Sequence, residues 1–161
     1  MTGVAPGRNT MTNISYEIRD GTIDDASDIC DLSDQLGYPV SEAEMAERLD
    51  SILNSDDHRV CVAVQPDGTV IAWIHVFKCQ TVESGLFAEI GGIIVSEAFR
   101  RKGIGQQLLK MAKRWIAQQK LQKLRVRTQI EREDAEAFYL KTGFSVSKHQ
   151  RVFDKVIDKE D

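Results

Sequence analysis

One stretch, residues 89–109, constrains the fold of this chain more than any other. It begins with the apolar run 90–95, continues through polar residues to Gly103 and Gly105, and then takes on a helical pattern. This order predicts a strand, a short turn and a helix. The turn would leave the first backbone N–H groups of the helix without partners, at the positive end of its dipole. Such an arrangement attracts phosphate.

The glycine spacing distinguishes among known phosphate loops. A dinucleotide fingerprint needs a third glycine three residues after Gly105, where the chain has Leu108. A nucleoside-triphosphate loop needs Gly-Lys-Ser or Gly-Lys-Thr, and neither follows the glycines. The chain instead has Arg-x-x-Gly-x-Gly, formed by Arg100, Gly103 and Gly105, with two more basic residues inside it. From these residues alone, the alternative that the glycines only shape a turn remains open.

Length and composition predict one domain. Residues 14–157 of the 161 are expected to form it, between a disordered tail at 1–13 and a frayed tail at 158–161. No apolar run approaches the roughly 20 residues that cross a bilayer, so no membrane partner is expected. The three cysteines lack CxxC spacing, which favours reduced thiols in the cytoplasm and no metal site.

Charge is distributed unevenly along the chain. Residues 20–57 hold twelve carboxylates and one basic residue, whereas residues 100–127 hold ten basic residues and no acidic one. The basic part suits an anion, and the acidic part suits either a cation or a solvated helix face. The basic part lacks the interleaved aromatic residues typical of nucleic-acid binding, so nucleic acid is not an expected partner.

Apolar periodicity predicts a mixed sheet with helices on both faces, an α/β or α+β fold. Two local signals support the order of elements: a capping box of Ser41 and Glu44, and a hairpin turn at 66–68. Helices are expected at 24–36, 41–53, 103–119 and 133–142. Strands are expected at 14–19, 59–65, 70–79, 86–95, 123–129, 144–148 and 151–157.

A second motif lies in residues 134–144, DAEAFYLKTGF. Its pattern, Ala-x-x-apolar-Tyr-x-x-x-Gly-Phe, is filled by Ala135, Phe138, Tyr139, Gly143 and Phe144. In this order and spacing, the two motifs resemble those of the GNAT superfamily of acyl-CoA-dependent N-acetyltransferases. The resemblance covers roughly residues 14 to 157.

The resemblance implies a sheet that splays after strand 86–95, with acetyl-CoA bound in the gap as cosubstrate and no metal. Glycine inside a strand predicts a bulge at Gly91 and Gly92. The pantetheine arm would pair with the main chain at 93–95, and the pyrophosphate would bind N–H groups at 101–106. The cofactor-binding residues so implied are Ile93, Ile94, Val95, Arg100, Arg101, Lys102, Gly103, Ile104, Gly105, Gln106, Arg132 and Tyr139.

The resemblance also implies catalytic roles. Tyr139 matches the family tyrosine that commonly protonates the departing thiolate, the alternative being that it only packs against the cofactor. Glu89 is the candidate base for the amine, as in histone acetyltransferases of the superfamily; alternatively it binds the ammonium or faces solvent, and water is the base. His75 is a weaker candidate, because a lone histidine on an apolar strand face is more often a core residue.

One position departs from the family pattern, because Arg132 stands where many members have asparagine. Residues 132–139 are similar to a small-molecule branch that includes aminoalkylphosphonate and aminoglycoside acetyltransferases. The leading interpretation is transfer of acetyl from acetyl-CoA to a primary amine of a small molecule, by direct attack in a ternary complex. A protein or peptide N-acetyltransferase and a non-catalytic acyl-CoA-binding module remain alternatives. Homodimers are common in this superfamily, and the sequence does not settle the oligomeric state.

Overall fold

The computed structural model describes residues 7–9 and 14–160, and these divide into two compact units that meet in sequence at Arg127 and Thr128. The strands are β1 (Gly7–Asn9), β2 (Ile14–Asp20), β3 (His58–Val64), β4 (Val70–Thr81), β5 (Gly85–Val95) and β6 (Leu124–Val126). The helices are α1 (Ala26–Asp34), α2 (Glu42–Leu53), α3 (Ile104–Gln118) and α4 (Glu133–Lys141), with 3-10 turns η1 (Ile23–Asp25) and η2 (Glu97–Phe99).

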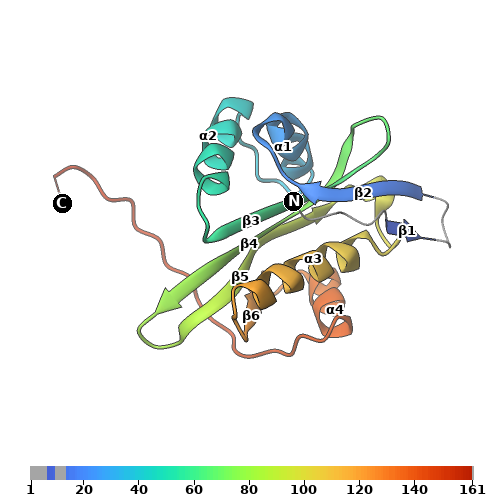
Figure 1. The fold of residues 1–161 in the computed structure, drawn as a ribbon. Coiled ribbons are helices and arrows are strands. Elements are labelled where there is room, and N and C mark those ends of the chain that lie inside the picture. The colour runs from blue at the N-terminus through green and yellow to red at the C-terminus, as the bar shows by residue number, and fades with distance from the viewer. Residues whose placement is uncertain (1–6, 10–13, 161) are drawn as a thin grey trace. The chain divides into compact units, whose positions relative to one another are not determined.

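The first unit is built on one mixed sheet with the strands in sequence order. Neighbours are antiparallel from β1 through β5, and β6 then joins β5 in parallel after the α3 crossover. Helices α1 and α2 lie on one face of the sheet and α3 lies on the other (Figure 1). The predicted fold class, a mixed sheet with helices on both faces, is confirmed.

The β3–β4 hairpin sets the register that later brings polar side chains together. Its turn is closed by a hydrogen bond from the Gln65 N–H to the Thr69 carbonyl, 2.9 Å, and Gly68 has the left-handed φ of 92° that the turn requires. Beyond the turn Val60 pairs with His75, and His58 pairs with Phe77. Side chains of directly opposed residues lie on the same face of a sheet, so this pairing decides which residues can touch.

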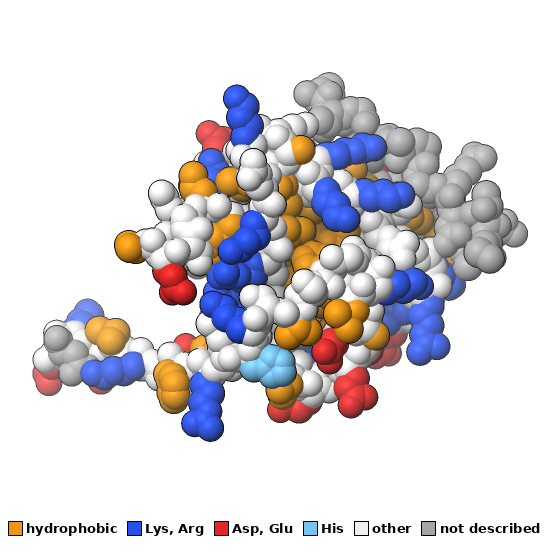
Figure 2. Space-filling view, turned by 90° about the horizontal axis from the view of Figure 1, so that it is seen from below, with side chains coloured by type: hydrophobic (Ala, Val, Ile, Leu, Met, Phe, Trp, Pro, Cys, Tyr) orange, Lys and Arg blue, Asp and Glu red, His pale blue; other side chains and the backbone are white. Residues whose placement is uncertain are grey.

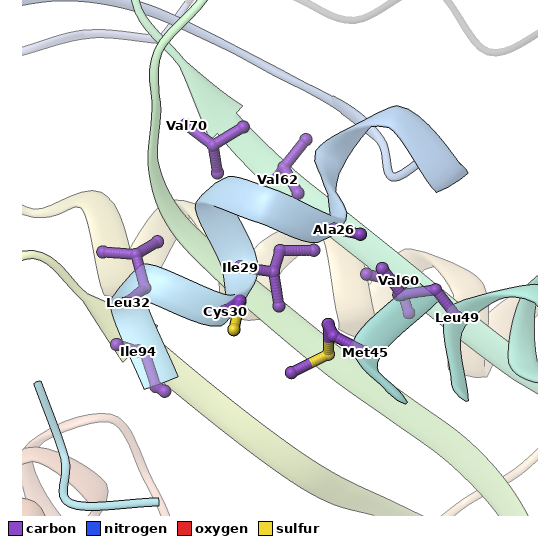
Figure 3. Packing of buried hydrophobic residues seen from close by; sticks show 10 residues of the cluster. All are labelled: Ala26, Ile29, Cys30, Leu32, Met45, Leu49, Val60, Val62, Val70 and Ile94. Carbon is purple, nitrogen blue, oxygen red and sulfur yellow. The ribbon is translucent and has the colours of Figure 1, made fainter. Parts of the chain in front are cut away.

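A core of aliphatic side chains fills the space between the sheet and helices α1 and α2 (Figure 3). Helix α2 begins as predicted at Ser41, whose hydroxyl accepts a hydrogen bond from the Glu44 N–H at 3.1 Å. The buried members of this core are Ala26, Ile29, Cys30, Leu32, Met45, Leu49, Val60, Val62, Val70 and Ile94. Where α1 and α2 lie on the sheet, this face is therefore covered by apolar packing.

The other face is covered by α3, an amphipathic helix. Its apolar stripe is buried, and its opposite side carries exposed Lys110, Lys113 and Arg114. Figure 2, which views the molecule from below the orientation of Figure 1, shows Lys and Arg side chains at many places on that surface. The stripe consists of Ile104, Leu108, Leu109, Ala112, Trp115 and Ile116.

The strands predicted at 144–148 and 151–157 are wrong, because the structure has no strand in either segment. Their alternating apolar pattern describes two faces, but a strand also needs a neighbouring strand to satisfy its backbone. Val152, Phe153 and Val156 are instead exposed, at 76%, 85% and 84% of their surface. The strand predicted at 123–129 is also shorter, since β6 pairs with β5 over only three residues.

A short strand falls within the N-terminal segment 1–13. Residues 7–9 form β1, which pairs with β2, while residues 1–6 and 10–13 lie outside the described residues. Among the described helices, none combines the length and apolar character needed to cross a membrane.

Candidate functional site

The sheet opens along β5, the strand of the first motif. β6 pairs with β5 only at Ala88, Glu89 and Ile90, while β5 itself continues as a strand to Val95. The ladder between β4 and β5 runs on through this continuation. From residue 91 to 95, β5 therefore carries backbone groups that the described β6 ladder does not use. This is the splay expected after the strand.

A β-bulge lies at the point where the sheet opens. His75 pairs with Gly92 and Val76 pairs with Ile90, so Gly91 is the extra residue in β5. A Cβ on Gly91 would lie 2.5 Å from His75 Nδ1, and one on Gly92 would lie 2.7 Å from the indole ring of Trp73. The two rings occupy the space that side chains at 91 and 92 would need. The bulge predicted from the glycine pair is confirmed, and the two rings account for glycine at both positions.

The turn that follows β5 presents the start of α3. Gly103, at the N-cap, has a left-handed φ of 82°, and Arg101 has a φ of 62°, which is unusual for a residue with a side chain. The Gln107 N–H donates to the Gly103 carbonyl, 3.2 Å, so the N–H groups of residues 104–106 precede the first bond of the helix. No side chain caps this end, and its first turn has no acidic residue.

Two arginines bracket this turn in different ways. Arg100 Nε donates to the Val95 carbonyl at 3.1 Å and so ties the turn to the end of β5. Arg101 is exposed beside it. A turn that combines right- and left-handed residues can direct successive N–H groups into a concave array that accommodates an anion, and here Arg101 and Gly103 are left-handed on either side of Lys102. The described geometry therefore fits a diphosphate at residues 101–106.

Glu89 lies in β5 just before the bulge, between β4 and β6, and is mostly buried, with 16% of its side chain exposed. Its Oε1 accepts a hydrogen bond from Arg127 Nε at 3.0 Å. Arg127 is half-exposed and follows the end of β6. This ion pair holds the carboxylate in one orientation next to the opening of the sheet.

His75 is not a lone histidine. Its Nε2 lies 2.9 Å from Nδ1 of His58 on the neighbouring strand, and the two rings are close to coplanar, at 16°. Phe77 stacks against His58, with ring centroids 5.5 Å apart. Burial lowers the pKa of His75 to about 4, and the charge of His58 adds to this effect. At neutral pH His75 is therefore an uncharged imidazole.

The second motif forms a helix end in the second unit. Helix α4 stops at a Schellman cap: Phe144 N–H donates to the Tyr139 carbonyl at 2.9 Å, and Gly143 has a φ of 100°. Rings of Phe138 and Phe144 contact Tyr139 edge-on, each at 5.4 Å between centroids. Burial raises the pKa of Tyr139, while the nearby charge of Arg132, the N-cap residue of α4, opposes the shift. The phenol is therefore protonated at neutral pH and can donate.

The first unit brings together most of the residues expected at the site. The bulge, the free stretch of β5, the turn and the start of α3 follow one another along the chain, with Glu89 at one end and Gln106 at the other. Tyr139 and Arg132 belong to the second unit, where Arg132 is the N-cap of α4 and Tyr139 lies in its last turn.

Sequence reasoning missed two residues of this region, His58 and Arg127. The hairpin turn at 66–68 contained part of the signal for His58, because it predicts that the two strands pair. Counting back from the turn alone would pair Val60 with Ile74, however, and only the register shift between Ala63 and Val64 pairs Val60 with His75 and places His58 on the same face. Arg127 had a weaker signal, two residues beyond the position that pairs with Glu89 in the parallel ladder.

An open hollow of about 630 Å³ lies at the far side of the histidine pair. His58 lines it together with the end of α2 and the end of α3, including Leu53, Trp115 and Gln118. The hollow does not include the bulge or the turn before α3. His58 thus lines the hollow, whereas His75 is not among its lining residues.

The sequence matches the model of a family described as the acetyltransferase (GNAT) family, over residues 26–144. That range contains the splayed strand, the turn before α3 and the whole of α4. Among curated proteins, none has a sequence that matches significantly.

Many solved structures share the fold. Aminoglycoside 6'-N-acetyltransferase AAC(6')-Ih from Acinetobacter baumannii superposes with a TM-score of 0.78 at 18% identity, covering 89% of this chain and 99% of that one. Glucosamine-6-phosphate N-acetyltransferase from Arabidopsis thaliana gives 0.72 at 24% identity, with coverage of 89% and 99%. AAC(6')-Iy, in complex with the bisubstrate analogue CoA-S-monomethyl-acetylneamine, gives 0.75 at 19% identity, with coverage of 88% and 99%.

Proposed function

The chain belongs to the GNAT family of acetyltransferases, which use acetyl-CoA, and from this premise we propose that it acetylates a primary amine of a small molecule. The observation that carries the proposal is the opening of the sheet, where β5 continues to Val95 after β6 has ended. Extended backbone of this kind pairs with an amide-bearing chain in the manner of a strand. The pantetheine arm carries two such amides and fits residues 93–95.

The turn before α3 supplies the matching anion site. The N–H groups of residues 101–106 would hold the pyrophosphate, with positive charge from Arg100, Arg101 and Lys102 nearby. This support comes from the left-handed φ of Gly103, the uncapped helix start and the lack of acidic side chains in its first turn.

Acetyl transfer then requires an amine without its proton and a leaving thiolate with one. Glu89 is proposed as the base that receives the proton of the acceptor's ammonium, because it is held at the opening by Arg127 and is largely shielded from water. A main-chain N–H of β5 is proposed to bind the tetrahedral oxyanion. Tyr139 is proposed as the acid that protonates the thiolate, and its raised pKa keeps the phenol in the donating form.

Small amines are favoured as acceptors by the character of the sheet face near the bulge. That face carries Trp73, His75 and Phe77 beside one shielded carboxylate, a combination suited to a compact cation with apolar parts. Three of the solved relatives are named for transfer to aminoglycosides or to glucosamine-6-phosphate. A protein or peptide amine is the second candidate.

A CoA-release assay over polyamines, aminoglycosides, aminosugar phosphates, aminophosphonates and amino acids tests the proposal. We expect turnover with at least one of these classes and an acetyl-CoA dissociation constant measurable by calorimetry. Tight acetyl-CoA binding with turnover of peptides alone would replace the small-molecule acceptor by a peptide. Binding without turnover of any amine, and without an effect of Tyr139→Phe, would identify a non-catalytic acyl-CoA-binding module.

A further inference from the structure

We propose that His75 and His58 form a proton relay, which takes a proton from the attacking nitrogen at the bulge and delivers it to the open hollow beside β3. The inference rests on the proposed function. It assigns a task to two residues that the family motifs do not include.

The chemistry calls for a second proton acceptor. An ammonium that becomes a secondary amide loses two protons, one before it attacks the thioester and one from the zwitterionic tetrahedral intermediate. Glu89 is the proposed acceptor for the first. The second is more acidic, because its nitrogen carries a positive charge next to the new C–N bond, so a weakly basic group suffices to receive it.

The geometry places His75 beside the reacting end of the strand. His75 lies opposite Gly92, and Glu89 lies opposite Phe77, so the imidazole and the carboxylate share one face of the sheet on either side of the bulge. Its Nδ1 is the atom nearest to the bulge, as shown by the 2.5 Å separation from a Cβ built on Gly91. Its other nitrogen, Nε2, is 2.9 Å from His58 Nδ1.

This arrangement lets His75 pass a proton without holding a charge. In the working tautomer, the His75 Nε2–H donates to His58 Nδ1, and His75 Nδ1 accepts. The N–H bond of the intermediate breaks as the His75 Nδ1–H bond forms, and the His75 Nε2–H bond breaks as the His58 Nδ1–H bond forms. His75 ends neutral and His58 ends as the imidazolium. The oxyanion then re-forms the carbonyl as the C–S bond breaks, and the departing thiolate takes its proton from Tyr139.

The surroundings of the two rings are consistent with a His75 that stays neutral and a His58 that releases the proton. On the same face the charged or titratable groups include His58 on β3, Glu89 on β5, Arg125 opposite it on β6 and Arg127 after β6. Glu89 and Arg127 are paired with each other, and Arg125 lies over the ring of Phe87. Burial keeps His75 neutral in the resting protein. His58 lines the hollow, where water can take up its proton.

Nitrogen-15 NMR of the wild-type protein labelled at histidine tests the pair without any reaction. The relay predicts that His75 stays neutral from pH 5 to 8 and carries its proton on Nε2, with His58 Nδ1 as acceptor. Saturating CoA is expected to change the His75 Nδ1 chemical shift. A His75 that titrates near its ordinary pKa, or one with its proton fixed on Nδ1 throughout, would overturn the relay.

Kinetics of His58→Ala and His75→Ala supply the second arm. Each variant should lower kcat about 10²-fold with an unchanged acetyl-CoA dissociation constant, and the double variant should be no slower than either, because the two act as a unit. Added imidazole can enter the hollow and should restore His58→Ala, but not the double variant. Gln118→Ala, which alters the same hollow without removing a histidine, is the control and should behave as wild type.

The outcomes separate this inference from the proposed function. Wild-type turnover combined with undiminished kcat in both histidine variants overturns the relay and leaves the acetyltransferase in place. Additive losses without imidazole rescue also overturn it, in favour of a packing role. A wild-type protein that turns over no amine overturns the proposed function and the relay with it, whatever the NMR shows.

Discussion

The bulge and the turn before α3 both depend on glycine, but for different physical reasons. At the bulge, Gly91 and Gly92 have no room for a Cβ because the rings of His75 and Trp73 occupy the space. At the turn, Gly103 is required by its backbone conformation, a φ of 82°, which an L-residue with a side chain adopts at a cost. One region is constrained by its neighbours and the other by its own dihedral angles.

The bulge within β5 and the turn after β5 are therefore expected to respond differently to substitution. At the bulge, His58 of β3, His75 of β4 and Glu89 of β5 lie on one face of the sheet, so the chemistry proposed there depends on residue identity. At the turn, binding relies on main-chain N–H groups, so side chains can change provided that the backbone keeps its shape. Substitutions should therefore affect kcat at the bulge and cosubstrate affinity at the turn.

The largest effect is expected at the bulge end, from Glu89→Gln. Loss of the proposed base should reduce kcat by 10²-fold or more, roughly the contribution of general base catalysis. Stability should change little, because the partner Arg127 is half-exposed and exposed ion pairs contribute at most about 1 kcal/mol. Steady-state kinetics and urea unfolding measure the two effects. Glu83→Gln, at an exposed carboxylate of the β4–β5 turn, is the matched control.

A kcat within a few-fold of wild type for Glu89→Gln would refute the proposal that Glu89 is the base. It would assign the carboxylate to ammonium binding if KM for the amine rises instead. It would leave water as the first proton acceptor if neither constant moves.

The next effect concerns the pH dependence of stability. His75 has a pKa of about 4 when folded and 6.5 as its ordinary value, so between these values the unfolded chain binds a proton that the folded chain does not. Stability is therefore full above pH 6.5 and falls as the pH drops toward 4, by up to about 3 kcal/mol. Urea titrations from pH 4.5 to 7.5 measure the slope. A slope of equal size in His75→Gln would assign it to other groups.

Gly91→Ala should destabilise the fold by roughly 1–3 kcal/mol, the usual cost of overpacking. The strain lies between the new methyl group and the His75 ring, so His75→Ala should relieve it, and a double-mutant cycle should show coupling. Gly85→Ala is the contrast: its φ is 69° with no neighbour within 4 Å, so its cost should be the same in both backgrounds. Additive losses for Gly91→Ala and His75→Ala would refute steric control of the bulge.

The smallest effect is expected at the turn, from Gly103→Ala. The left-handed conformation should cost about 1–2 kcal/mol in this segment, and acetyl-CoA affinity should fall about tenfold as the N–H array distorts. Arg101→Gly changes the same turn in the opposite sense, because glycine relaxes the φ of 62°. Calorimetry should find a smaller affinity loss for Arg101→Gly. The reverse order would show that charge outweighs backbone shape there.

Much of the fold could be predicted because its signals are local. The Ser41 capping box, the turn at 66–68 and the glycine pair in β5 each act within a few residues, and each occurs where expected. The two motifs could be found for the same reason, since backbone cradles and helix caps constrain nearby residues. Glu89 was identified from its position relative to the bulge.

The remaining features depend on which segments pair. The segments at 144–148 and 151–157 alternate like strands, but periodicity cannot supply a partner, and β6 has only a three-residue ladder. The contacts of His75 were misjudged for a related reason. A single strand showed an apolar face around it, whereas its decisive neighbour, His58, comes from another strand of the same hairpin.

The short ladder between β5 and β6 also has a consequence for the resting protein. Those N–H groups of residues 91–95 that point away from β4 are expected to exchange their hydrogens with solvent sooner than the paired N–H groups of the β3–β4 hairpin. On the proposed assignment, the pantetheine arm of acetyl-CoA pairs with residues 93–95 as an added strand. The protein with acetyl-CoA bound is then thermodynamically more stable than the protein without it. Release of CoA then removes the added strand in every catalytic cycle. The concentration of free acetyl-CoA determines the fraction of protein molecules that carry this strand at any moment.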